Sequence, residues 1–258
     1  MLQPPPTRSH AFTALASLAA DVLLPRACAG CARMLPRGAC QTGWCEACLT
    51  ALGSGVSRCG QCAINSLTPL CEGCQTKPPP FSRTVVLGAY APPLDRIIRA
   101  LKFNRQPALG AALAAALAPI VQRELARLAP GHPRHRVVAV PLSEERLAER
   151  GYNQSLLIGR PLAQALGLPI DPVALHRQRA GPPQSRLSPV ARASNVDRAF
   201  IATRPHHEPV LLVDDVMTTG ATLAAATHAL IRAGSPSVIC VIAARTALPD
   251  VSHCPGPP

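Results

Sequence analysis

The sequence predicts an α/β fold, in which helices flank a parallel β-sheet, preceded by a small cysteine-rich domain. Short, continuously apolar runs such as VVAVP and VLLV alternate with helical patterns in the second half of the chain. Strands of this kind are typical of parallel sheets buried on both faces. Four C-x-x-C pairs lie in the first third of the chain. A length of 258 residues accommodates one medium domain and a smaller one.

The N-terminal segment, residues 1–27, is predicted to form an amphipathic helix on the body of the protein. In the run AFTALASLAADVLL, Leu15, Leu18 and Val22 recur at helical spacing. The run is short for a membrane span and Asp21 interrupts it, so we expect no membrane span. A signal peptide is the alternative. The metal-like cysteine pairs that follow suit a reducing compartment better than secretion, and we therefore expect a cytoplasmic protein.

Residues 28–76 carry the four C-x-x-C pairs and are predicted to form a double zinc ribbon. Two cysteines separated by two residues can point at one ion from a tight turn, and two such turns complete a tetrahedral thiolate site. Sequential pairing assigns one ion to Cys28, Cys31, Cys45 and Cys48, and a second to Cys59, Cys62, Cys71 and Cys74. Interleaved pairing is the alternative, although the short gap between the last two pairs favours the sequential one. Four thiolates leave no open coordination position, so both Zn²⁺ ions would be structural, and Cys40 is a bystander or a substitute ligand.

A proline-rich linker, QTKPPPFS, separates the ribbons from the larger domain, residues 83–248. Apolar runs in this domain predict strands at 83–90, 136–142, 175–178, 199–203, 209–215 and 237–244. Helical patterns predict helices at 94–103, 109–128, 154–166 and 222–233. Residues 180–198 have no steady period and are predicted to form a long mobile loop, and residues 249–258 a disordered tail.

The formal net charge of +12, from 26 basic and 14 acidic residues, indicates an anionic partner such as a nucleotide, a phosphate or a nucleic acid. Nearly all the basic residues are arginine, whose planar fork matches phosphate oxygens. A compositional bias toward Ala, Arg, Pro and Gly explains the excess equally well. The aromatic content of 3% disfavours an extended platform for stacking single-stranded bases.

The stretch VLLVDDVMTTGATL, residues 210–223, places two adjacent carboxylates at the end of a predicted strand and small and hydroxyl residues at the start of a helix. In a parallel sheet, ligands bind beyond the carboxyl ends of the strands. Free N–H groups at a helix N-terminus bind anions, and Gly220 allows the backbone to approach closely. Asp214 and Asp215 can accept hydrogen bonds from sugar hydroxyls. The stretch therefore predicts a ribose 5-phosphate site, and it has neither the lysine of a Walker loop nor a G-x-G-x-x-G fingerprint.

This stretch resembles the phosphoribosyl pyrophosphate (PRPP) motif of type I phosphoribosyltransferases. More narrowly, the chain resembles the ComF family of competence-associated, ComF/GntX-like proteins from LLPRACAGC near residue 23 to VIAAR at residue 245. The resemblance is carried by the double zinc ribbon and by IIRALKF, VPLSEERLAERGYNQ and PPQSRLSPVARASNVDRAF. The chain departs from the family pattern in the turn NRQ after KF and in lacking a threonine before PPQ.

The resemblance implies a type I phosphoribosyltransferase fold that binds PRPP, with Mg²⁺ accompanying the pyrophosphate. It implies that Asp214 and Asp215 hold the ribose hydroxyls as catalytic residues. The 5-phosphate would bind to Met217, Thr218, Thr219, Gly220, Ala221 and Thr222. Candidate contacts to the pyrophosphate or from the mobile loop are Arg146, Arg150, Asn153, Gln184 and Arg192. Judged from the residues alone, Arg146 and Arg150 fit a solvated helix face nearly as well, and Lys102 fits an ordinary helix-end cation.

Two functions stay open at this point. The first is a PRPP-dependent phosphoribosyltransferase, a glycosyltransferase whose acceptor the sequence does not identify. The second is a non-catalytic competence factor that binds DNA or a nucleotide and uses the fold as a ligand sensor or scaffold. In both cases the resemblance implies a role in DNA uptake during natural transformation, with single-stranded DNA or proteins of the competence machinery as candidate partners.

Overall fold

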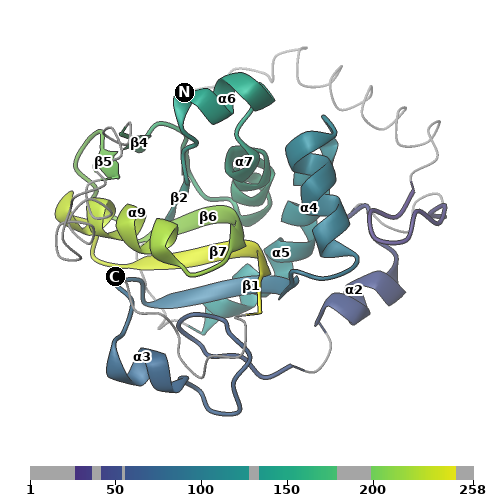
Figure 1. The fold of residues 1–258 in the computed structure, drawn as a ribbon, viewed down its shortest axis with the longest axis horizontal. Coiled ribbons are helices and arrows are strands. Elements are labelled where there is room, and N and C mark those ends of the chain that lie inside the picture. Colours follow the sequence, from purple (N-terminus) through teal and green to yellow (C-terminus); the bar gives the residue numbers. More distant parts are fainter. Residues whose placement is uncertain (1–26, 37–41, 54–55, 128–133, 179–198, 248–258) are drawn as a thin grey trace, which may run out of the picture.

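The structure is a computed structural model that describes residues 27–36, 42–53, 56–127, 134–178 and 199–247. The predicted N-terminal helix up to residue 26, the whole of the predicted mobile loop with Gln184 and Arg192, and the C-terminal tail lie outside these residues. The described elements are, in chain order, α2 (Glu46–Gly53), α3 (Glu72–Thr76), β1 (Arg83–Ala89), α4 (Leu94–Phe103), α5 (Ala108–Ala126), β2 (Arg136–Ala139), α6 (Glu144–Arg150), α7 (Gln154–Leu166), β3 (Ile170–Asp171), β4 (Leu175–Arg177), β5 (Phe200–Ala202), β6 (Val210–Met217), α9 (Ala221–Arg232) and β7 (Val238–Arg245) (Figure 1).

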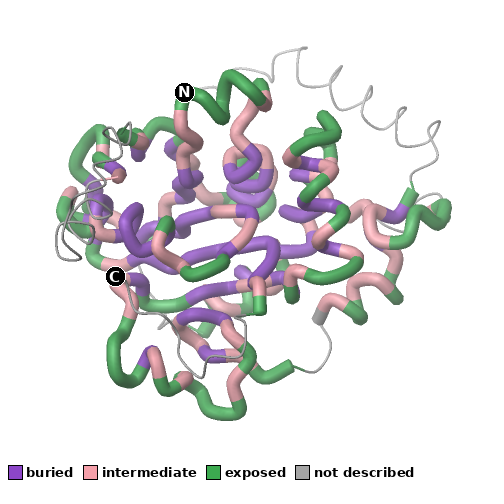
Figure 2. The backbone as a smooth tube through the Cα atoms, in the orientation of Figure 1, coloured by how far each residue is buried: buried purple, intermediate pink, exposed green. Residues whose placement is uncertain are grey.

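A five-stranded parallel sheet with the strand order β1-β7-β6-β2-β3 forms the centre of the protein. Strands β6 and β7 pair along their full lengths, from Val210 opposite Val238 to Met217 opposite Arg245. Every residue of β7 is buried, and so are the first four of β6 (Figure 2). Burial on both faces explains the continuous apolar runs of the sequence, and the parallel sheet with flanking helices confirms the predicted fold class.

Helices cover both faces of the sheet, and each face has its own apolar cluster. Leu211 and Val213 of β6 point to one face, where they join Leu101 of α4, Leu117 of α5 and Ile158 of α7. Leu212 points to the other face and joins residues of α9, such as Leu223 and Leu230. This division follows from the alternation of side chains along a strand. It means that consecutive apolar residues of β6 pack on opposite faces of the sheet.

The strands and helices predicted for residues 83–248 are present with differences at their ends, and the structure adds α2, α3, α6 and β3. Strand β6 continues two residues past the aspartates to Met217, because β7 extends to Arg245 and offers it a partner. Helix α6 begins where the Ser143 hydroxyl accepts a hydrogen bond from the Arg146 N–H group (3.4 Å) and ends at Gly151, whose φ is 78°. The short strand β3 was not predicted, and β4 and β5 form a separate antiparallel pair rather than joining the sheet.

Helix α5 is the one described helix with the length and mean hydropathy (1.3) of a membrane span. Core helices pass the same test, and α5 packs against α7 and β1. Leu113, Leu117 and Val121 of this helix are buried in the core. Its Gly110 lies so close to α7 that an added Cβ atom would approach the Leu157 carbonyl oxygen to 2.8 Å. The apolar character of α5 is therefore accounted for by packing within the protein.

Candidate functional site

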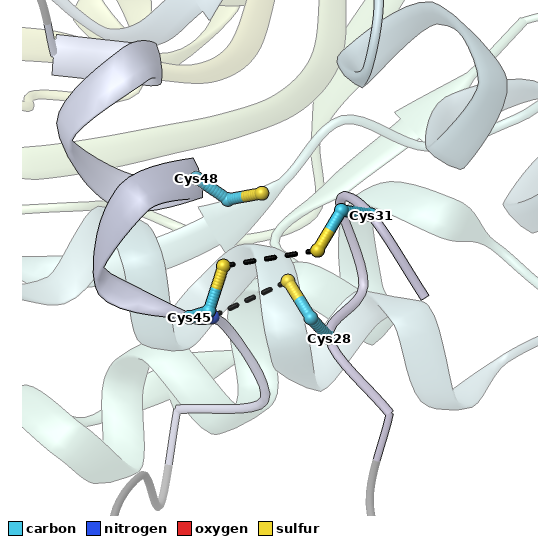
Figure 3. Close-up of side chains that lie close together, drawn as sticks. All are labelled: Cys28, Cys31, Cys45 and Cys48. Carbon is cyan, nitrogen blue, oxygen red and sulfur yellow. Dashed lines mark hydrogen bonds between the residues drawn. The ribbon is translucent and has the colours of Figure 1, made fainter. Parts of the chain in front are cut away.

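The eight predicted cysteine ligands form two groups of four, here called the first and second tetrads, and the grouping follows the sequential pairing. The first tetrad is Cys28, Cys31, Cys45 and Cys48, and the second is Cys59, Cys62, Cys71 and Cys74. In each tetrad the sulfur atoms lie within 4.8 Å of one another, and Figure 3 shows the four sulfurs of the first tetrad converging from a turn and from the start of α2.

The sulfur spacing in both tetrads fits a tetrahedral metal ion. The Sγ atoms of Cys31 and Cys45 are 3.8 Å apart, and those of Cys62 and Cys71 are 3.6 Å apart. Four sulfurs at a Zn–S distance of about 2.3 Å are separated by about 3.8 Å, whereas a disulfide requires about 2.05 Å. Both tetrads could therefore hold Zn²⁺.

Backbone N–H groups prepare one thiol in each tetrad for metal binding. Burial raises the pKa of the Cys28 thiol, but N–H donors, led by that of Cys45 at 3.2 Å, outweigh burial and lower the pKa to about 6. The same balance lowers the pKa of Cys59 to about 7. Burial instead raises the pKa of Cys48 to about 12. Metal binding must therefore displace the proton of Cys48, whereas Cys28 is already largely a thiolate near neutral pH.

The tetrads dock on the two sides of the edge strand β1. The Trp44 side chain, beside the first tetrad, is fully buried, and its Nε1–H group donates a hydrogen bond of 2.7 Å to the Ala112 carbonyl in α5. The second tetrad joins the apolar cluster of the α9 face. The Thr84 hydroxyl of β1 donates to the carbonyl of Gln61, which lies between two ligands of this tetrad, at 2.6 Å. The cysteine-rich segments thus cover a sheet edge that would otherwise expose unpaired backbone groups.

Asp214 and Asp215 are adjacent in β6, but different helices hold their carboxylates. The Ser155 hydroxyl, at the start of α7, donates to Asp214 Oδ1 at 2.8 Å, and the Asp215 N–H group donates to the same oxygen at 2.9 Å. Asp215 Oδ1 lies 2.7 Å from Lys102 Nζ at the end of α4, with the two side chains 10% and 20% exposed. The Lys102 ammonium group beside Asp215, and the hydroxyl and N–H donors to Asp214, make the two like charges tolerable.

Residues Met217–Thr222, here called the phosphate loop, connect β6 to α9. Gly220 has a φ of 89°, which favours glycine, and an added Cβ atom would lie 2.6 Å from the Met217 side chain. Thr218, Thr219 and Thr222 are exposed. The Thr219 hydroxyl accepts a hydrogen bond of 3.3 Å from the Ala221 N–H group. The loop thus places hydroxyl groups and the positive end of a twelve-residue helix directly after the two carboxylates.

Among the other candidate residues that the structure describes, the side chains of Arg150 and Asn153 have structural contacts. Arg146 and Arg150 belong to α6, which has no buried residue, and the Arg150 guanidinium lies over the Phe103 ring at 5.1 Å. The Asn153 side chain caps α7, accepting from the Ser155 N–H group at 2.9 Å and donating to the Val140 carbonyl at 3.0 Å. Asn153 therefore ties the loop after β2 to the helix that carries Ser155.

Sequence reasoning did not find Ser155, and it favoured a helix-end role for Lys102. Their local signals were weak, because a serine in the first turn of a helix and a lysine in the last turn are both common. Only the three-dimensional structure shows that Ser155 and Lys102 contact the carboxylates of Asp214 and Asp215. The stretch IIRALKF does contain Lys102, so the segment was noticed even though the role of its lysine was not.

We expect Asp214→Asn to stabilise the protein at pH 8. Burial, followed by the charge of Asp215, raises the pKa of Asp214 from 3.8 to about 7. The folded state therefore binds a proton more tightly than the unfolded state, and the free energy of unfolding falls as the pH rises from about 4 to about 7. Asparagine removes this penalty, so the melting temperature of the variant should exceed that of the wild type at pH 8, and the gain should disappear toward pH 4.

Glu208→Gln serves as a control, because it should change the melting temperature at pH 8 in the opposite direction. The hydrogen bond from Arg136 lowers the pKa of Glu208, so this carboxylate stabilises the protein at neutral pH and the contribution is lost as the pH falls. The melting temperature of this variant should lie below that of the wild type at pH 8. An Asp214→Asn variant that melts lower than the wild type at pH 8 would contradict the proposed cost of the buried charge.

Comparison with known proteins agrees with this geometry. The phosphoribosyl transferase domain family matches residues 153–253, which include Ser155, the two aspartates and the phosphate loop. The chain is 38% identical over 208 residues to the DNA utilization protein YhgH of Salmonella typhi, covering 79% of this chain and 91% of that protein. It is 31% identical over 189 residues to Competence protein F of Haemophilus influenzae, covering 71% and 82%.

The chain belongs to the ComF family. Another relative, YhgH of Escherichia coli strain K12, is 37% identical over 201 residues, covering 76% of this ComF-family chain and 87% of that protein. Among solved structures, adenine phosphoribosyltransferase from Leishmania tarentolae aligns with a TM-score of 0.31 and 14% identity, covering 57% of this chain and 74% of that one. In this ComF-family protein both cysteine tetrads precede the segment that matches the phosphoribosyl transferase domain.

Proposed function

We propose that this protein binds PRPP between Asp214, Asp215 and the phosphate loop, and that it acts as a phosphoribosyltransferase in DNA uptake. The observation that carries the proposal is the direct succession of two independently held carboxylates and an exposed helix N-terminus. A ribose 5-phosphate has vicinal hydroxyls at one end and a phosphate at the other, so it requires both features at this spacing. The proposed role in DNA uptake rests on relatives named for DNA utilization and competence.

The proposed chemistry follows from the charges of the site. The phosphate loop and the start of α9 hold the 5-phosphate, while the carboxylates accept hydrogen bonds from the ribose hydroxyls. The bond from the anomeric carbon to pyrophosphate breaks as the bond to the acceptor nucleophile forms, and positive charge develops on the ribose ring. Two carboxylates in a fixed, partly buried position stabilise that charge. The acceptor gives up a proton and takes the ribose 5-phosphate, and pyrophosphate leaves.

The proposed ions fit the donor atoms that the chain offers them. Carboxylate and hydroxyl oxygens suit Mg²⁺, a hard cation that, when bound, neutralises the charge of pyrophosphate. We propose that Zn²⁺ occupies both thiolate tetrads and serves the fold of residues 28–76, ahead of a transferase domain at 83–248. Thiols held at non-bonded distances suit a reducing compartment, and this supports a cytoplasmic location.

Isothermal titration calorimetry of the zinc-loaded protein with PRPP and Mg²⁺ tests the proposal. We expect saturable binding of one PRPP per chain. Ribose 5-phosphate alone should bind more weakly, because it lacks the pyrophosphate. No detectable heat at millimolar PRPP would overturn the proposal. In that case, a gel shift with single-stranded DNA that weakens steeply with salt would support the non-catalytic DNA-binding alternative.

A further inference from the structure

Arg245, the last residue of β7, joins the second tetrad to the phosphate loop. Its side chain is buried, with 2% of the residue exposed. The Nε–H group donates a hydrogen bond of 3.0 Å to the carbonyl of Cys62, a member of the second tetrad. The Nη1 group donates to the carbonyls of Met217 (3.1 Å) and Thr218, the first two residues of the phosphate loop. One buried guanidinium therefore contacts a proposed metal ligand and the proposed phosphate site.

These contacts determine which way the loop's N–H groups point. In a trans peptide the C=O and N–H bonds are antiparallel and lie in one plane. The carbonyls of Met217 and Thr218 are turned toward Arg245, so the N–H groups of Thr218 and Thr219 point away from it. Within the described residues, neither of these N–H groups donates to a protein acceptor. Arg245 thus orients the Thr219 N–H group, and it orients the Thr218 N–H group together with the Thr246 N–H group, which donates to the Met217 carbonyl at 3.1 Å.

The geometry requires arginine at this position. The planar guanidinium carries several N–H donors in a fixed fork, and here they reach carbonyls on three segments of the chain. A lysine ammonium is a compact group on a flexible stem and cannot hold the same set at the same angles. Removal of the guanidinium would take one donor from each of these carbonyls, although the Met217 carbonyl would keep the Thr246 N–H group at 3.1 Å.

The second tetrad also supplies charge balance for this buried cation. A Zn²⁺ ion held by four thiolates carries a net negative charge. Two arginines lie against this segment, since Arg245 contacts the Cys62 carbonyl and Arg58 donates to the Ala63 carbonyl at 3.1 Å. A buried guanidinium stays charged and is costly without compensation. A metal-loaded second tetrad would provide that compensation beside the Cys62 carbonyl, to which Arg245 donates.

A second contact brings the same cysteine segment close to the loop. The Gln61 side chain donates a hydrogen bond of 3.2 Å to the Phe81 carbonyl. Phe81 is buried, and its ring edge lies 4.0 Å from the position of a Cβ atom added at Gly220. The second tetrad is therefore packed behind the phosphate loop as well as tied to it through Arg245.

We propose that Arg245 is a positioning residue that couples metal occupancy of the second tetrad to anion binding in the phosphate loop. The proposal rests on the proposed function, because it takes the loop to be the phosphate site. Coupling of this kind is reciprocal: if the metal strengthens PRPP binding, PRPP must strengthen metal retention by the same factor. An independent metal-binding domain that merely preceded the transferase domain would show neither effect.

The experiment compares wild type, Arg245→Gln and Arg245→Lys. Arg136→Gln serves as the control, because Arg136 pairs with Glu208 and has no contact with the phosphate loop in the described structure. Zinc content is measured first, then PRPP binding by calorimetry, then the rate of zinc transfer to a coloured chelator with and without PRPP. We expect Arg245→Gln to weaken PRPP binding by at least about tenfold, because the loop N–H groups lose the orientation that the guanidinium helps to hold. Arg245→Lys should recover part of it, and Arg136→Gln should bind as the wild type does.

The zinc-transfer rate separates coupling from general destabilisation. PRPP should slow one phase of zinc transfer in the wild type and in Arg136→Gln, and should leave both phases unchanged in Arg245→Gln. Equal PRPP affinity in Arg245→Gln and wild type would overturn the proposal. If Arg245→Gln does not fold, the wild type alone decides, because PRPP binding without any change in zinc transfer contradicts coupling. Absence of PRPP binding to the wild type is a different result, since it overturns the proposed function itself.

Discussion

Replacing both Asp214 and Asp215 with asparagine is expected to abolish PRPP binding detectable by calorimetry while both zinc ions remain bound. Each carboxylate is proposed to accept a hydrogen bond from a ribose hydroxyl. A hydrogen bond to a charged group contributes about 1.5–3 kcal/mol, so each substitution should weaken binding by about 10- to 150-fold. The double variant should therefore lose roughly two to four orders of magnitude in affinity if the two effects add.

The single variants distinguish a binding defect from a folding defect. Asp214→Asn should raise stability at pH 8, because the charge of Asp214 is costly in the folded state. Its expected loss of PRPP binding therefore cannot be attributed to unfolding. Asp215→Asn instead removes the partner of Lys102. A residue that lowers stability and is needed for binding is a recognised sign of a functional site.

Glu208→Gln is the matched control, since it removes a carboxylate outside the site. It should bind PRPP as the wild type does. The same variants can also be expressed in a naturally transformable host, where they replace the ComF-family protein of that host. We expect the double asparagine variant to lose transformation there. Normal transformation by a variant that no longer binds PRPP would contradict a role for the site in DNA uptake and would favour a scaffold.

Much of this site could be predicted from the sequence because its central part is local. Two aspartates, a glycine with a left-handed φ and the start of a helix lie within a few residues of one another, so one stretch of sequence contains both carboxylates and the phosphate loop. The cysteine tetrads were predictable for the same reason, since each C-x-x-C pair forms a turn of its own. The sequential pairing, which the sequence only favoured, is confirmed by the sulfur positions.

The rest of the site depends on contacts between distant parts of the chain. Ser155, Lys102 and Arg245 reach the site from α7, α4 and β7, and no local pattern in those helices or in that strand distinguishes them. In the sequence, Arg245 was noticed only as the last residue of VIAAR, directly after the strand predicted at 237–244. The docking of the two tetrads on opposite faces of the sheet was hidden for a similar reason, because it depends on the edge position of β1.

Loss of the first tetrad is expected to unfold the protein. The double substitution Cys28→Ser and Cys48→Ser removes two thiolates from a site whose zinc binding should supply roughly 10–16 kcal/mol of apparent free energy. That amount is as large as the whole stability of an ordinary domain, about 5–15 kcal/mol. Cys28 and Trp44 are buried among the residues of α4, α5 and β1, so the tetrad belongs to the main core.

Because the first tetrad packs in the main core, its loss should destabilise the whole protein and not the zinc ribbon alone. If the first tetrad belonged to a separate ribbon, its loss would leave the transferase domain with its own melting transition. The Trp44 hydrogen bond to Ala112 ties the ribbon to α5, and an added Cβ atom at Gly88 of β1 would lie 3.6 Å from the Leu52 carbonyl of α2. We therefore expect one cooperative transition in the wild type and its loss in the variant, measured by calorimetric melting and by zinc content.

The control is Cys40→Ser, which replaces a cysteine outside both tetrads. This variant should keep two zinc ions and a melting temperature close to that of the wild type. A variant without the first zinc ion that still melts cooperatively and binds PRPP would show that the ribbon is dispensable for the fold.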